Sequence, residues 1–110
     1  VLPNLEESLL AARAAVQHAP QNPDSHYSLA LALERKGQYQ EAEQAMQQAL
    51  VVNPAYGDVY FSLGALYADH LNEPQKSVDA FRRYLELGGQ SERAIRAVQA
   101  NEAPAEKPVP

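Results

Sequence analysis

A chain of 110 residues is long enough for one domain, and its 45% of hydrophobic residues can form a packed core. A net charge of −5 has the wrong sign for a nucleic-acid-binding protein, which usually carries a basic stripe. Because the chain has no cysteine, disulfides, thiolate metal sites and cysteine nucleophiles are excluded.

The sequence lacks the signals of membrane insertion or export. No apolar run approaches the ~20 residues needed to span a bilayer, and the first residues do not resemble a signal peptide. Since the first residue is Val1 rather than Met, we expect a processed form or a piece of a longer protein. Localisation therefore stays open between the cytoplasm and a bacterial periplasm.

The spacing of apolar residues, together with much Ala, Leu, Gln and Glu, predicts an all-α chain. Six helices are expected, at about residues 4–18, 24–36, 40–52, 57–70, 74–87 and 91–100. Asn22-Pro23 marks a helix start, and Gly37 and Gly88-Gly89 mark helix ends. The segment 101–110 contains three prolines and no apolar period, so we expect a disordered or extended tail.

The chain repeats itself. An offset of 34 residues aligns the second predicted helix with the fourth, and an offset of 35 aligns the third with the fifth. The aligned pairs include Leu29 with Leu63, Ala30 with Gly64, Leu33 with Tyr67, Ala42 with Ser77, Met46 with Phe81 and Leu50 with Leu85. The change of offset predicts one inserted residue in the loop around Asn72 and Pro74. The repeating unit is a helix–turn–helix.

These residues resemble the tetratricopeptide repeat. The family pattern is matched by Leu29-Ala30, Leu33, Gly37, Tyr39, Ala42, Met46, Ala49-Leu50 and Pro54. His26 stands where the pattern has Trp, and Tyr84 stands where a small Ala is usual. The resemblance implies repeats at about 23–56 and 57–90, a half repeat at about 4–22 and a capping helix at about 91–100.

The implied fold is a right-handed α-solenoid of antiparallel helix pairs with a concave side. Paired helices approach closely only where the facing side chains are small, as at Ala30, Gly64 and Ala42. We expect Tyr84 to change the packing of the last helix.

The sequence offers no chemistry for catalysis. His18, His26 and His70 have no second ligand at metal-like spacing, and the serines lack the context of an activated nucleophile. Gly88-Gly89 is not part of a phosphate-binding loop. We therefore expect no enzyme activity, no metal and no cofactor.

The resemblance implies instead a protein or peptide partner on the concave side. The first-helix positions that usually contact ligands carry Asp24, Tyr27, Ser28, Leu31, Arg35, Asp58, Phe61, Ser62, Ala65 and Asp69. Because neither Lys nor Asn occurs there, a clamp for a C-terminal carboxylate is disfavoured. An apolar strip edged by acids predicts an apolar or basic partner segment.

Two alternatives remain open. Tyr27 and Phe61 either pack between neighbouring helices or form the floor of a groove. The chain either binds a different protein as a scaffold or associates with itself through its open N-terminal end or the groove. Neither alternative involves nucleic acid or direct membrane insertion.

Overall fold

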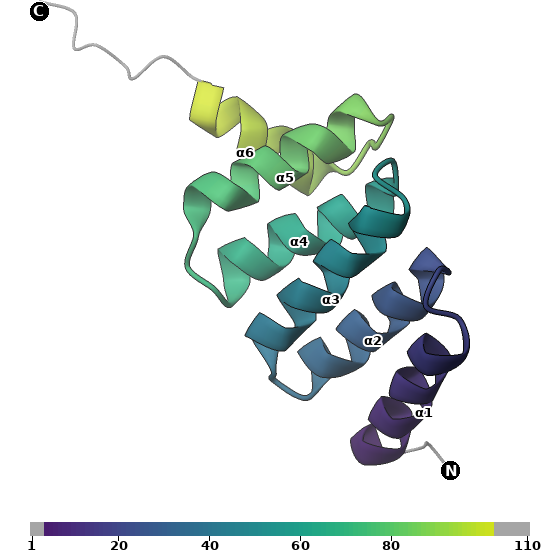
Figure 1. Cartoon of the computed structure of the whole chain (residues 1–110). Coiled ribbons are helices and arrows are strands. Elements are labelled where there is room, and N and C mark those ends of the chain that lie inside the picture. Colours follow the sequence, from purple (N-terminus) through teal and green to yellow (C-terminus); the bar gives the residue numbers. More distant parts are fainter. Residues whose placement is uncertain (1–3, 103–110) are drawn as a thin grey trace, which may run out of the picture. The chain divides into compact units, whose positions relative to one another are not determined.

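The structure is a computed structural model that describes residues 4–102 (Figure 1). Over these residues it contains six α-helices and no strands, which confirms the predicted all-α helical-repeat fold. The helices are α1 (Leu5–His18), α2 (Pro23–Arg35), α3 (Tyr39–Val52), α4 (Gly57–Asp69), α5 (Pro74–Glu86) and α6 (Glu92–Glu102). In the described part of the chain no helix is long and apolar enough to cross a membrane.

The residues predicted to start and end helices are confirmed in these roles. The side chain of Asn22 accepts a hydrogen bond from the amide of Asp24 at 2.9 Å and so caps α2, whose first residue is Pro23. Gly37 after α2 and Gly88 after α5 have φ angles of +83° and +99°. Only glycine adopts this left-handed conformation without strain, and it stops a helix from continuing.

The predicted helix boundaries lie within one residue of the structure, except at the end of the last helix. The last helix continues to Glu102, because proline first occurs two residues later and Arg82 of α5 pairs with Glu102 at 3.5 Å. The predicted tail 101–110 therefore begins too early, and its remainder, 103–110, lies outside the described residues.

The predicted insertion of one residue in the second repeat is confirmed. Three residues, 36–38, connect α2 to α3, but four, 70–73, connect α4 to α5.

The contacts divide the chain into two units, residues 1–59 and 60–110, which we describe separately. In the first unit, α2 packs against both α1 and α3 (Figure 1). Its core contains Leu9 of α1, Ala30 and Leu33 of α2, and Ala42 and Met46 of α3. Ala30 and Ala42 are fully buried, as expected for small residues at close helix contacts.

The second unit begins within α4 and includes its residues 60–69. In this unit α5 packs against that part of α4 and against α6. The Ser77 hydroxyl donates a 2.7 Å hydrogen bond to the Gly64 carbonyl of α4. A Cβ atom on Gly64 would lie 2.6 Å from the Phe81 ring, so only glycine fits there without movement. Phe81, Ala94 and Val98 form the core between α5 and α6.

Tyr84 changes the packing at the start of α6, as predicted. Its hydroxyl accepts hydrogen bonds from the backbone amides of Gln90 and Ser91, both at 3.2 Å. Its ring lies so close to Gly89 that a Cβ there would approach ring atoms to 2.3 Å. The large side chain therefore holds the turn between α5 and α6 while its ring packs against Phe61 of α4.

Candidate protein-binding surface

Asp24 and Tyr27, the first two predicted site residues, contact residues at the start of α4. The Tyr27 and Tyr56 rings lie edge to face with centroids 5.4 Å apart. The Tyr27 hydroxyl donates to the Asp58 carbonyl at 3.5 Å, and the Tyr56 hydroxyl donates to the Asp24 carboxylate. Burial, and then the hydrogen bond to Asp24, raises the pKa of Tyr56 well above its usual range.

Ser28, Leu31 and Arg35 lie together on another part of α2, where they face α1. They form one wall of a groove of about 480 Å³, which we call the α1–α2 groove. Its lining residues are Ser8, Ala11, Ala12 and Ala15 of α1, and Ser28, Leu31, Ala32 and Arg35 of α2. Leu31 is 39% exposed, although it is a large apolar residue. The groove is therefore apolar, shallow and open to solvent.

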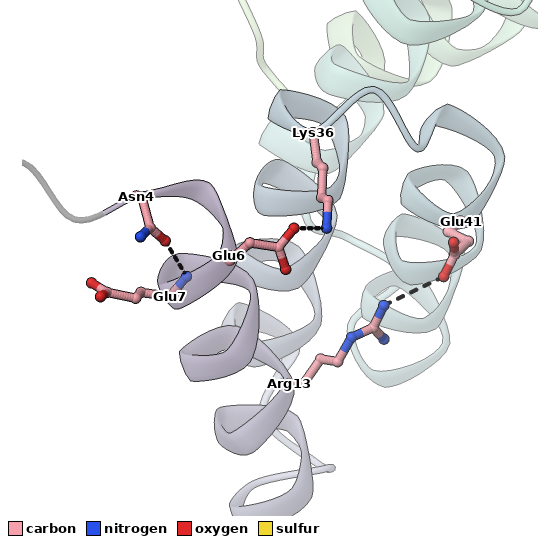
Figure 2. A network of polar contacts seen from close by, with 6 residues as sticks. All are labelled: Asn4, Glu6, Glu7, Arg13, Lys36 and Glu41. Carbon is pink, nitrogen blue, oxygen red and sulfur yellow. Dashed lines mark hydrogen bonds and ion pairs between the residues drawn. The ribbon is translucent and has the colours of Figure 1, made fainter.

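Polar contacts at two points hold α1 in place (Figure 2). Glu6 pairs with Lys36 after α2, and Arg13 pairs with Glu41 of α3 at 3.5 Å. Asn4 caps α1 by accepting a hydrogen bond from the Glu7 amide at 2.8 Å. Exposed ion pairs of this kind contribute little each, typically ~0–1 kcal/mol. Burial of Leu9 and Ala12 is thus the main attachment of α1, and the pairs fix its position.

The α1 side of this groove is missing from the set of site residues predicted from the sequence. The signal was present in the repeat, because Ser8 aligns with Ala42 and Ser77, and Ala15 aligns with Ala49. Small residues at these positions mark a face that a neighbouring helix can approach closely. The positions that usually contact ligands in this family lie on the first helix of each repeat. They therefore predicted site residues on α2 and α4 only.

Phe61, Ala65 and Asp69, predicted site residues of the second unit, contact other helices of that unit. The Phe61 ring packs against Phe81 and Tyr84, with centroids 5.5 and 5.2 Å apart. Ala65 joins the same cluster, and Ser62 is half-buried. Asp69 pairs with Arg93 of α6 at 2.6 Å. Phe61 thus contributes to packing in the folded chain, as one of the two interpretations of this residue predicts.

The pair between Asp69 and Arg93 predicts a pH-dependent contribution to stability. The hydrogen bond from Arg93 lowers the pKa of Asp69. A carboxyl group whose pKa is lowered on folding stabilises the folded state at pH values above its usual pKa. This contribution is lost as the pH falls through the lowered pKa. Since the pair is half exposed, Asp69→Asn should cost only a few tenths of a kcal/mol at pH 7. Urea denaturation over a descending pH series should show this difference shrinking as Asp69 becomes protonated, and a difference independent of pH would contradict the assignment.

His26 has a packing role in the first unit. It is nearly buried, and its Nε2 lies 2.7 Å from the Pro20 carbonyl oxygen. Because that oxygen can only accept, Nε2 carries the proton. No group of three or more His, Cys, Asp and Glu residues within 4–102 is arranged to hold a metal ion.

Comparison with known proteins identifies the class. Residues 3–51 and 27–92 match the sequence model of the tetratricopeptide repeat, and the chain belongs to this family. The crystal structure of MamA has a similar fold, with a TM-score of 0.79, 23% sequence identity and coverage of 87% of this chain. The chain spans 56% of the length of that MamA chain. No curated protein sequence is significantly similar to the chain described here.

Proposed function

We propose that this chain is a scaffold that binds an apolar segment of another protein in the α1–α2 groove. Tetratricopeptide repeats generally mediate protein–protein interaction, and the chain belongs to that family. The observation that carries the proposal is the exposed Leu31 beside a wall of small residues, in a groove of about 480 Å³. Such concave apolar sites with a few polar groups at the rim are typical binding sites.

The charges of the predicted acidic edge favour an apolar segment over a basic one. Asp24 already accepts the Tyr56 hydroxyl, and Asp69 is paired with Arg93. A basic partner residue would have to compete with these contacts. The side chain that rims the groove is Arg35, which is exposed and basic. We therefore propose that the segment is apolar and that a polar or acidic group of the partner lies near Arg35.

The groove limits the affinity. It is formed by two helices, so a bound segment buries less than the ~1,200 Å² that marks the lower end of stable interfaces. We expect dissociation constants in the micromolar range, on the order of 1–100 μM. In this proposal the chain acts by binding alone, without catalysis or a cofactor.

Substitution of Leu31 by aspartate should weaken binding. A random library of 16-residue peptides, displayed on phage, is selected on the chain, and an enriched peptide is then measured by fluorescence anisotropy. Leu31→Asp places a charge on the groove wall and should weaken binding at least about 10-fold, which corresponds to ~1.4 kcal/mol.

The matched control is Val51→Asp. Val51 is another exposed apolar residue, 72% accessible, and it lies on α3 outside the groove. This variant should bind as the unchanged chain does. Equal binding by both variants, or equal loss in both, would contradict the groove as the binding site.

Self-association is the second candidate function. It is favoured by the position of the exposed large apolar residues, because Leu5 and Leu10 lie on α1, and Leu31 faces it. Exposed apolar surface of this kind often marks an interface. Light scattering over a concentration series tests this function, and a monomer at every concentration would remove it.

A further inference from the structure

The face of α1 that lines the groove corresponds to faces of α3 and α5 that are buried by a paired helix. Ser8 of α1 aligns with Ala42 of α3, which is fully buried, and with Ser77 of α5, which is 4% exposed. Ser8 itself is half-buried and lines the groove. Within residues 4–102, α1 thus keeps the small-residue face of a second helix and has no first helix against it.

The pair α4 and α5 shows which residues of a facing helix pack against such a small-residue face. Ser77 donates to the carbonyl of Gly64, which is possible because residue 64 has no side chain to hold the two backbones apart. In the first unit Ala30 occupies the equivalent position of α2 and is fully buried. A serine or alanine on one helix is therefore matched in both pairs by a glycine or alanine on the other.

Resting on the proposed function, we propose that the occupant of the α1–α2 groove is a single amphipathic helix. It lies antiparallel to α1 and presents Gly or Ala to Ser8, so that the serine hydroxyl can donate to its backbone carbonyl. The occupant thereby repeats the geometry of α4 on α5.

A helix fits the lining better than an extended peptide does. Five of the eight lining residues are Ala or Leu, and the polar side chains are Ser8, Ser28 and Arg35. An extended segment would bury backbone N–H and C=O groups that these few side chains cannot satisfy, at a cost of roughly 1–3 kcal/mol each. A helix satisfies these groups internally and presents only side chains.

The charge at the rim agrees with this orientation. A helix antiparallel to α1 runs in the same direction as α2, because α2 is itself antiparallel to α1 (Figure 1). Its C-terminal end then lies near Arg35 in the last turn of α2. A cation beside the C-terminus of a helix is favourable, because the last carbonyls carry partial negative charge.

The test uses a peptide with the sequence of α2 itself, residues 23–35. Its Asp24 side chain is joined by a lactam to a lysine in place of Ser28, which holds the helix through two positions that are exposed in the chain. Titration of the full chain by calorimetry should show binding in the micromolar range. The same peptide with Ala30→Leu should bind at least about 10-fold more weakly, because a large side chain prevents close approach.

Two variants of the full chain locate the site. Ala11→Leu fills the groove and should weaken peptide binding at least about 10-fold, whereas Ala14→Leu should leave it unchanged. Both alanines are exposed on α1 and only Ala11 lines the groove, so the pair controls for helix propensity and stability.

The outcomes separate this inference from the proposed function. If library peptides bind in a Leu31-dependent way but the α2 peptide does not bind, the helical occupant is overturned and the groove remains the proposed binding site. A dimer that Ala11→Leu dissociates, without peptide binding, would overturn it in favour of a second copy. Equal effects of Ala11→Leu and Ala14→Leu would also overturn it.

Discussion

Alanine in place of Gly64 should destabilise the second unit, even though alanine is the better helix former. The gain in helix propensity is about 1 kcal/mol. The new Cβ would lie 2.6 Å from the ring of Phe81, which is 1% exposed and has little room to move. Overpacking in a core usually costs ~1–3 kcal/mol. We expect the difference, a net loss of up to about 2 kcal/mol, to be measurable by urea denaturation.

The first repeat supplies the rescue. There the aligned positions carry Ala30 and Met46, whereas the second repeat carries Gly64 and Phe81. Methionine is flexible and can yield to a neighbouring methyl group. The double variant Gly64→Ala/Phe81→Met should therefore be more stable than the sum of the two single effects predicts, with a coupling of about 1 kcal/mol. Additive effects within about 0.5 kcal/mol would show that the two positions do not form one contact.

Alanine in place of Tyr84 should release α6 from α5. The substitution removes the ring that packs against Phe61 and Gly89, and the hydroxyl that accepts the amides of Gln90 and Ser91. Loss of a large, partly buried aromatic side chain and of these hydrogen bonds should cost about 2–4 kcal/mol. Hydrogen exchange should accelerate at residues 92–102 more than in α1 to α3.

Tyr84→Phe separates the two contributions. The ring stays, and only the two hydrogen bonds to the hydroxyl are lost, which should cost about 1–2 kcal/mol. If protection of α6 in Tyr84→Ala equals that in the unchanged chain, Tyr84 does not hold the turn between α5 and α6.

Local sequence signals were sufficient for the helices and their ends. Gly37, Asn22 and Pro23 act within one turn of the chain, and the change of offset between repeats located the longer loop around Asn72. The end of α6 was less predictable, because Glu102 is paired with Arg82, which lies 20 positions away in the sequence. A contact between distant residues leaves no local pattern.

The candidate site was only partly predictable for the same reason. The family positions include Ser28, Leu31 and Arg35, which the structure brings together along the groove. They gave no means of knowing that Phe61 packs on Phe81 or that Asp69 pairs with Arg93. Those contacts depend on which faces of α4 are covered by α5 and α6. The α1 wall of the groove depends likewise on how α1 lies against α2.

The central claim is that small residues on α1 and exposed residues on α2 form one surface for a protein segment. Nuclear magnetic resonance of the isotopically labelled chain, titrated with the library-selected peptide, tests it most directly. Amide shifts should change at residues 8–15 and 28–35, and the outer face of α3 around Val51 should not respond. Shifts confined to α5 and α6, or spread evenly over the chain, would contradict the claim.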